Sequence, residues 1–264
     1  MIWLCYNHSL EWPACSLSEG LMLRWMLENG SYEPYRGDEI IKGERSVVDF
    51  KLASGSPRRQ ELLEIAGWRV SIHPVTIEEK PLQDEDPENY AKRLACEKAE
   101  KVANEDGMIV VGADTIVIHE NRILGKPQNK KLAAEMLKEL QGKVHRVVTA
   151  IALVDRVKER SLVDTCETDV PMRKYSQGEI EAYIASGSPL DKAGAYGIQD
   201  GSFRPVDLDE MVGCFANVMG LPLCHLARAL RRLGIETPER IYERCMAHTK
   251  YHCQVYRDIL QREI

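Results

Sequence analysis

The sequence has no long hydrophobic run and no long run of basic residues. No apolar stretch reaches the roughly 18 residues that a helix needs to cross a bilayer, so we expect no membrane partner. The formal net charge is −6 at pH 7, and this mildly acidic balance argues against a nucleic-acid partner. Residues 1–12, MIWLCYNHSLEW, lack the basic start and apolar core of a signal peptide, so we expect a cytoplasmic protein.

Two common nucleotide-binding motifs are also missing. There is no GxxxxGK[ST] phosphate loop, and no GxGxxG follows a predicted strand, which argues against P-loop and Rossmann proteins. Cysteine is too sparse for a disulfide framework, with eight residues spread over a chain of 264. In a reducing compartment these cysteines are expected to be free thiols or metal ligands.

The patterns that are present divide the chain into three zones. Residues 1–46 form an N-terminal extension that we expect to be partly helical, with three of the four tryptophans. Residues 47–235 alternate strand and helix patterns, which predicts an α/β domain. Residues 236–264 predict one C-terminal helix, because apolar or weakly polar residues recur at helical spacing. These residues are Ile241, Cys245, His248, His252, Val255 and Ile259.

The stretch LASGSPRRQELL, residues 52–63, predicts an anion site at the start of a helix. Ser56 suits the N-cap and Pro57 the first helical position. Arg58 and Arg59 then fall in the first turn, where a cation opposes the helix dipole. A bound anion, held by amide groups, a hydroxyl and a guanidinium, would explain this placement. The alternative is a solvated basic turn.

Two acidic residues stand next to apolar stretches. Asp114 lies between MIVVGA and TIVI, where a carboxylate is unfavourable unless it is paired or bound to a metal. Glu79 closes an apolar stretch that we predict to be a strand. Together with the basic turn, these carboxylates suggest a Mg²⁺–phosphate site. The alternative for Asp114 is a structural role in capping a turn.

Three lysines could complete such a site. Lys98 lies on a predicted helix, Lys126 in the loop LGKP, and Lys192 in the polar loop PLDKAGAYGIQD. If they converge on one cleft, they would neutralise a polyphosphate. The alternative for each lysine is an ordinary solvated side chain.

Six separated motifs resemble those of the Maf family of nucleoside triphosphate pyrophosphatases, in the same order and at similar spacing. The resemblance covers residues 49 to about 234. It implies an elongated twisted mixed sheet flanked by helices, with two lobes around a deep central cleft. It also implies hydrolysis of a nucleoside triphosphate to monophosphate and pyrophosphate with a divalent metal, Mg²⁺ or Mn²⁺. The motifs are LASGSPRRQELL, VGADTIVI, LGKP, KVHRVVTAIAL, SGSPLDKAGAYGIQ and ANVMGLPL.

The resemblance assigns roles to individual residues. Asp114 matches the general base, which needs burial or a metal because an ordinary aspartate is a weak base at neutral pH. Glu79 matches a second acidic residue that would bind the metal together with Asp114. Residues that match the phosphate-contacting set are Ser56, Arg59, Lys98 and Lys126, to which the loop residue Lys192 is added.

Three residues near the base, Arg58, Thr115 and Gln199, are similar to those of the branch that acts on dTTP and UTP. The Gln amide can both donate and accept, which suits the edge of uracil or thymine. The resemblance therefore implies an enzyme that clears noncanonical pyrimidine nucleotides or adjusts nucleotide pools. Alternatives are a purine pyrophosphatase and a nucleotide-binding regulator of septum formation and cell division with secondary catalysis.

The chain departs from the family pattern in a few places. Asp200 follows Gln199 where the family usually has glycine, which would change the charge or flexibility of this loop. Gln141 replaces a small serine in a turn. The sequence leaves the oligomeric state open, a homodimer included.

The two ends of the chain carry candidate zinc ligands. A tetrahedral Zn²⁺ site joining the termini is chemically reasonable, because cysteine and histidine are its usual ligands. The alternative is that these residues are buried helix positions and unpaired thiols. The candidates are Cys5, His8, Cys15, Cys245, His248, His252 and Cys253.

Overall fold

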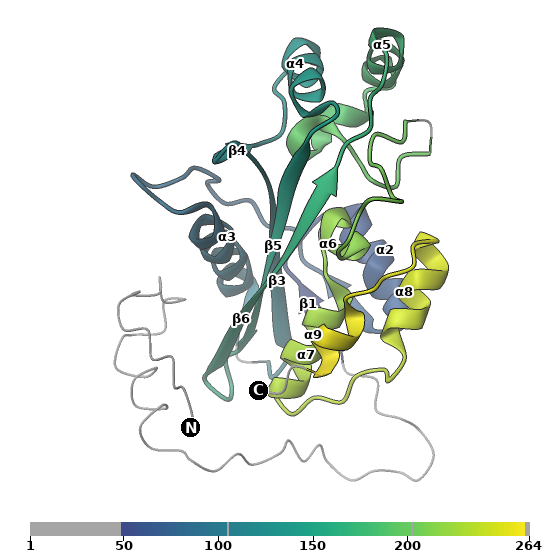
Figure 1. Cartoon of the computed structure of the whole chain (residues 1–264). Coiled ribbons are helices and arrows are strands. Elements are labelled where there is room, and N and C mark those ends of the chain that lie inside the picture. Colours follow the sequence, from purple (N-terminus) through teal and green to yellow (C-terminus); the bar gives the residue numbers. More distant parts are fainter. Residues whose placement is uncertain (1–48, 105, 202, 262–264) are drawn as a thin grey trace, which may run out of the picture.

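The computed structural model describes residues 49–104, 106–201 and 203–261, and in them a mixed β-sheet forms the centre (Figure 1). The strand order is β2-β1-β3-β5-β6, and β4 pairs with the end of β3. β1 runs parallel to both of its neighbours, β2 and β3, whereas β5 runs antiparallel to β3 and β6, and β4 antiparallel to β3. The strands are β1 (Asp49–Leu52), β2 (Arg69–Ile72), β3 (Ile109–His119), β4 (Arg122–Leu124), β5 (Val144–Asp155) and β6 (Arg160–Pro171).

Helices cover both faces of this sheet. In Figure 1, α3 lies on one side, and α2 with α6 to α9 lies on the other, while α4 and α5 stand at one end of the long β5–β6 hairpin. This confirms the predicted α/β class with a mixed sheet flanked by helices. The helices are α2 (Pro57–Ala66), α3 (Pro87–Val102), α4 (Lys130–Leu140), α5 (Gln177–Ala185), α6 (Phe215–Met219), α7 (Leu223–Arg232), α8 (Ile241–Thr249) and α9 (Tyr256–Gln261), with 3₁₀ turns η1 (Ser188–Asp191) and η2 (Ala193–Ala195).

The packing of α3 on β3 is unusually close. Small residues of α3, including Ala95 and Ala99, are fully buried against the sheet. Gly112 of β3 faces them, and a Cβ atom there would lie 2.1 Å from the backbone oxygen of Ala95. The helix backbone therefore rests directly on the strand, and this brings Lys98 of α3 beside Asp114 of β3.

The helix α2 begins and ends as its sequence predicts. Ser56 occupies the N-cap with extended backbone, and Pro57 follows at the first helical position. Gly67 ends the helix at φ 79°, in the left-handed region that glycine adopts without strain. Arg58 and Arg59 thus lie in the first turn, close to the carboxyl end of β1.

The stretch around Asp114 is one continuous strand, β3. Two sequence predictions need correction. Glu79 does not close a strand, because β2 ends at Ile72 and an irregular segment follows. Proline at position 74 explains the early end, since it cannot donate a ladder hydrogen bond.

The predicted single C-terminal helix is two helices, α8 and α9. The chain turns at Lys250, whose φ of 55° ends α8. Tyr251 then points inward, donates a hydrogen bond to the Met211 carbonyl at 2.6 Å and packs against Phe215. Burying this aromatic ring competes successfully with one more helical turn. The N-terminal extension, residues 1–46, lies outside the described residues.

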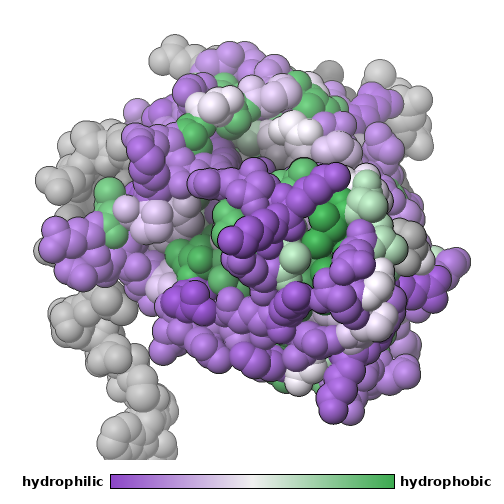
Figure 2. Space-filling view, turned by 90° about the horizontal axis from the view of Figure 1, so that it is seen from above, coloured by the Kyte–Doolittle hydropathy of each residue, from purple (hydrophilic) through white to green (hydrophobic). Residues whose placement is uncertain are grey.

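Within the described residues, none of the helices combines the length and the apolar character required to cross a lipid bilayer. Seen from above, the molecular surface is predominantly hydrophilic, and hydrophobic residues are visible mainly where it is hollowed (Figure 2).

Candidate active site

The residues predicted to act on a ligand line one cavity. It is open to solvent, contains about 770 Å³ of empty space, and is bounded by α2, α3, β3 and the loop that carries η1 and η2. All ten predicted site residues are among its lining: Ser56, Arg58, Arg59, Glu79, Lys98, Asp114, Thr115, Lys126, Lys192 and Gln199.

At the centre of the cavity, one ammonium joins two carboxylates. The Nζ atom of Lys98 lies 2.6 Å from Oδ1 of Asp114 and 2.7 Å from Oε1 of Glu79. Lys98 and Asp114 are buried, while Glu79 is half exposed. Burial raises the pKa of Glu79, but the hydrogen bond and charge of Lys98, helped by Lys126 and Arg59, outweigh burial and hold it below its usual value. Glu79 is therefore an anion at neutral pH.

The same two carboxylates fit a divalent metal. Because both contact one Nζ atom, Asp114 and Glu79 present their oxygens to a common point. Mg²⁺ and Mn²⁺ prefer oxygen ligands, and Mg²⁺ is commonly held by one or two carboxylates plus phosphate oxygens of the substrate. The donor set therefore suits a metal that arrives with a phosphorylated ligand.

A second group of potential metal ligands lies at the end of β3, where His119 closes the strand, Glu120 follows it and Glu139 of α4 lies beside them. Among the described residues, His119, Glu120 and Glu139 bring three ligand atoms within 4.8 Å of one another. Cations already face this group, since Lys143 contacts Glu120 at 3.3 Å and Arg122 forms a salt bridge with Glu139. None of these residues lines the cavity of Asp114.

Arg59 is buried and mostly engaged with the protein. Nε donates to the Gly220 carbonyl at 2.8 Å, Nη1 to the Ser54 hydroxyl at 3.1 Å and Nη2 to the Thr115 hydroxyl at 3.1 Å. Burial lowers the pKa of Arg59, and the charge of Asp114 opposes this effect. A guanidinium has five N–H groups, so two remain for a ligand. Arg59 thus fixes the floor of the cavity while keeping part of its donor capacity.

Two other groups are free for a ligand. Ser56 occupies the N-cap of α2, yet its hydroxyl makes no capping hydrogen bond. Lys126 is exposed, and it forms no hydrogen bond or salt bridge with any residue that the structure describes. The start of α2 also offers unpaired amide groups, which favour anions.

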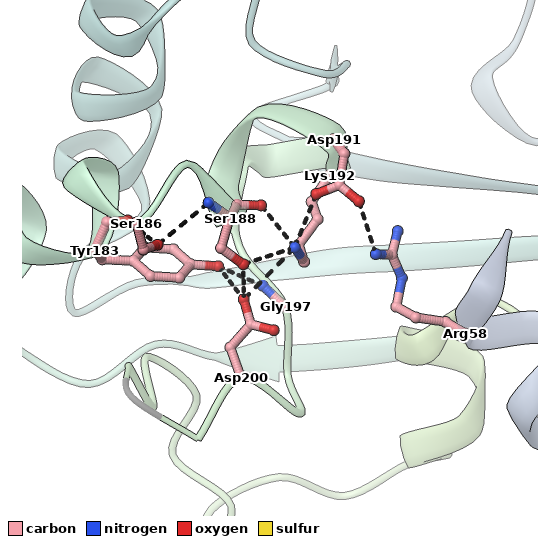
Figure 3. A network of polar contacts seen from close by, with 8 residues as sticks. All are labelled: Arg58, Tyr183, Ser186, Ser188, Asp191, Lys192, Gly197 and Asp200. Carbon is pink, nitrogen blue, oxygen red and sulfur yellow. Dashed lines mark hydrogen bonds and ion pairs between the residues drawn. The ribbon is translucent and has the colours of Figure 1, made fainter.

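Lys192 was predicted to contact a phosphate, but its ammonium is hydrogen-bonded to residues of its own loop (Figure 3). Its Nζ atom donates to the Ser188 carbonyl at 2.6 Å, the Ser188 hydroxyl at 2.9 Å and Oδ1 of Asp191 at 2.8 Å. A lysine has three N–H groups, so these contacts use all of them. The other oxygen of Asp191 accepts a hydrogen bond from Arg58 at 3.1 Å, which links α2 to η1.

The remaining predicted residues differ in their freedom. The Thr115 hydroxyl contacts Thr149 at 2.9 Å as well as Arg59, so it belongs to a buried hydrogen-bond network. Gln199 is exposed, lines the cavity and has no hydrogen-bond partner within the described part of the chain.

Sequence reasoning missed Asp191 and Gly220. The polar motif PLDKAG contained a signal for Asp191, which directly precedes Lys192. Gly220 shows no comparable signal, because its role comes from a carbonyl that accepts from Arg59.

The residues predicted to bind zinc do not form such a site in the described region. His248 pairs with Glu61 at 2.9 Å, and no group of three potential ligands includes His248, Cys245 or Cys253. Burial raises the pKa of Cys245 to about 12, helped by Cys214 and Cys253, so its thiol stays protonated at neutral pH. Cys5, His8 and Cys15 lie outside the described residues.

Comparisons with known proteins show which family the chain resembles. The family model described as "Maf-like protein" matches residues 49–233. A protein named dTTP/UTP pyrophosphatase from Geobacter sp. (strain M21) is 45% identical over 184 residues, 69% of this chain and 94% of that protein. One of the same name from Bacillus anthracis is 44% identical over 187 residues, 70% of this chain and 95% of that protein. A HAM1 protein from Coxiella burnetii is a structural neighbour with TM-score 0.38 and 14% identity, covering 77% of this chain and 99% of that one.

Proposed function

The chain belongs to the Maf family, and on that premise we propose that it hydrolyses nucleoside triphosphates to monophosphate and pyrophosphate, with dTTP and UTP preferred. The observation that carries this proposal is the meeting of Asp114, Lys98 and Glu79 at the centre of a cavity whose walls are rich in cations. Five cations and three carboxylates line this cavity, so a triphosphate would supply the negative charge that the carboxylates leave unbalanced.

Asp114 is the proposed general base. Its Oδ1 atom is held by Lys98 at 2.6 Å, and Oδ2 has no hydrogen-bond partner among the described residues, so Oδ2 is free to accept from water. The water oxygen forms a bond to the α-phosphorus while the bond from that phosphorus to the bridging oxygen breaks. The water proton passes to Asp114, and pyrophosphate leaves.

The cations and donors around the phosphate chain stabilise the charge that moves onto pyrophosphate. Lys126, the Ser56 hydroxyl and the first amides of α2 are available for this purpose. Arg59 contributes its two remaining N–H groups. Lys98 offsets one of the two negative charges of Asp114 and Glu79 and so reduces their repulsion toward the phosphates.

Asp114 and Glu79 would hold a divalent metal, Mg²⁺ or Mn²⁺. When bound, such an ion neutralises phosphate charge and polarises phosphorus–oxygen bonds. The low pKa of Glu79 keeps this ligand ionised without any contribution from the metal.

Base selection is assigned to Arg58, Thr115 and Gln199. Gln199 has the exposed carboxamide, which matches the acceptor and donor on the edge of uracil or thymine. Thr115 acts indirectly, because its hydroxyl is bound to Arg59 and Thr149. Arg58 lies at the edge of the cavity beside Asp191.

A panel of nucleoside triphosphates tests this proposal. We expect pyrophosphate, not orthophosphate, from UTP and dTTP in the presence of Mg²⁺ or Mn²⁺. Asp114→Asn should lower kcat by about 10²- to 10⁴-fold while UTP binding, measured by calorimetry, is retained. Asp209→Asn, a change at an exposed aspartate away from the cavity, is the matched control.

Two results would contradict the proposal. UTP binding without turnover with any divalent ion would favour a nucleotide-binding regulator. Faster turnover of ITP than of UTP would favour a purine pyrophosphatase.

A further inference from the structure

A carboxylate that belongs to no proposed chemical step lies behind the base-selecting loop. Oδ2 of Asp200 accepts hydrogen bonds from the Tyr183 hydroxyl and from the Ser188 hydroxyl, the latter at 2.9 Å (Figure 3). The Nζ atom of Lys192 lies 3.7 Å from the same oxygen. Asp200 thus connects α5, η1 and the loop after η2, and it directly follows Gln199.

The neighbouring glycine leaves the space that this arrangement needs. A Cβ atom on Gly197 would lie 2.8 Å from Oδ1 of Asp200 and 2.9 Å from Cε of Lys192. The Gly197 amide also donates to the Tyr183 hydroxyl at 3.2 Å. The Tyr183 hydroxyl therefore holds both ends of the turn from Gly197 to Asp200. Within the turn, the Asp200 amide donates a hydrogen bond to the Gly197 carbonyl at 3.2 Å.

Charge balance gives Asp200 a second role. Lys192 is buried, and its nearest carboxylate, Asp191, is largely exposed and also paired with Arg58. An incoming anion that attracts Arg58 or Lys192 would compete with Asp191. Asp200 is the more buried of the two carboxylates beside Lys192, so it keeps a negative charge next to this ammonium in either case.

We propose that Asp200 is a positioning residue for base selection. Through Tyr183, Ser188 and Lys192 it fixes the turn Gly197–Gln199, so that the Gln199 carboxamide is presented to the base in one orientation. This inference rests on the proposed function, because it takes Gln199 as the group that meets the base. Asp200 itself touches neither substrate nor metal.

The experiment compares UTP with ATP as substrates for the full-length enzyme and five variants. Asp200→Gly and Tyr183→Phe remove the hydrogen bond between the Tyr183 hydroxyl and Asp200. Gly197→Ala adds a methyl group that would clash with Asp200 and Lys192. For each of these we expect the ratio of kcat/KM for UTP over ATP to fall by about tenfold or more, mainly through KM for UTP. The kcat for UTP should change by less than about threefold, since the reacting groups are untouched. Asp200→Asn keeps one carbonyl oxygen that can accept from both hydroxyls, so it should retain most of the ratio. Asp209→Asn should leave the ratio unchanged.

Hydrogen exchange of the free protein supplies a readout that does not depend on activity. Amides of residues 197–201 should exchange faster in Asp200→Gly than in the wild type, with α3 unaffected. Unchanged selectivity or unchanged exchange in Asp200→Gly, in an enzyme that prefers UTP, would overturn this role and leave the proposed function standing. A wild-type enzyme without any preference for UTP would overturn the proposed selectivity, and this role with it.

Discussion

Two buried lysines face the same cavity from opposite walls, and carboxylates hold each of them. Lys98 contacts Glu79 and Asp114, which come from an irregular segment and from β3, far from each other in the sequence. Lys192 contacts Ser188 and Asp191, which lie within one turn of it. The long-range contacts of Lys98 join the segments that carry the proposed chemistry, whereas the local contacts of Lys192 shape a loop. Burial beside a carboxylate is therefore common to both lysines, and what distinguishes them is whether the carboxylate belongs to a distant segment or to the same loop.

Replacing the two lysines in turn is the strongest test of this distinction. Lys98→Met should lower kcat/KM for UTP by about 10²- to 10³-fold, because it removes a preorganised charge beside the reacting phosphate. Lys192→Met should lower it by less than about tenfold and should mainly reduce the preference for UTP. Steady-state kinetics with both substrates measures this difference. Equal losses of kcat/KM in the two variants would contradict the proposed difference between Lys98 and Lys192.

Glu79 provides the next largest effect. Glu79→Gln should raise the Mg²⁺ concentration needed for half-maximal activity by about tenfold or more, since it removes one charged ligand. The measurement is a metal titration of initial rate at saturating UTP. Glu78→Gln is the control, because Glu78 is exposed and pairs with Lys80 at the surface. An unchanged metal requirement in Glu79→Gln would assign the metal to other groups.

Replacing Lys126 tests whether a lysine without a protein partner among the described residues binds the phosphates. Lys126→Met should raise KM for UTP by about three- to tenfold with little change in kcat, because an exposed ammonium contributes modest binding energy. The same change at Lys131, which pairs with Glu135 on α4, should have no effect. A loss confined to kcat would place Lys126 in the chemical step instead.

The smallest expected effect concerns the free energy of unfolding and its dependence on pH through His145. His145 contacts the hydroxyl of Tyr196, a cavity residue, at 2.7 Å. Burial, with a smaller effect of His119, lowers the pKa of His145 to about 3 from the ordinary value of 6.5. Between these two values the unfolded chain binds a proton that the folded protein does not, so acidification favours unfolding.

The free energy of unfolding should therefore fall as pH drops below 6.5, by at most about 1.4 kcal/mol per pH unit from this group. Urea denaturation at pH 7, 6 and 5 measures the slope. His145→Gln should make the slope shallower, even though it removes a contact to Tyr196. An identical slope in the two proteins would show that other groups govern the response to acid.

Local signals in the sequence predicted much of the fold and the site. The N-cap and proline of α2, the apolar run around Asp114 and the glycine that ends α2 each act over a few residues, so the sequence shows them directly. The strand β4 and the helix α6 were not predicted, because they are too short to show a periodic pattern. The strand β6 was not predicted either, because polar residues interrupt its apolar pattern. The convergence of Asp114, Glu79 and Lys98 could be expected from resemblance to a family, but not from spacing alone.

The sequence predicted which residues line the cavity better than it predicted which hydrogen bonds those residues make. Lys192 lines the predicted cavity, yet its hydrogen bonds are taken up by its own loop. Asp200 looked like a change in local charge or flexibility, and the structure ties it to Tyr183 and Ser188. Both outcomes depend on which side chains meet in three dimensions. The break between α8 and α9 arises in the same way, from the burial of Tyr251.

The absence of a side chain at Gly112 limits which substitutions this position can accept. A methyl group there would force α3 away from β3 by about 1 Å, since the nearest backbone oxygen would otherwise be at 2.1 Å. Lys98 rides on that helix, and a displacement of this size at a reacting group can reduce turnover by about 10²-fold. The absence of one carbon atom at Gly112, on the strand that bears the proposed base and outside the lining of the cavity, thus helps to set the distance between the Asp114 carboxylate and the Lys98 ammonium.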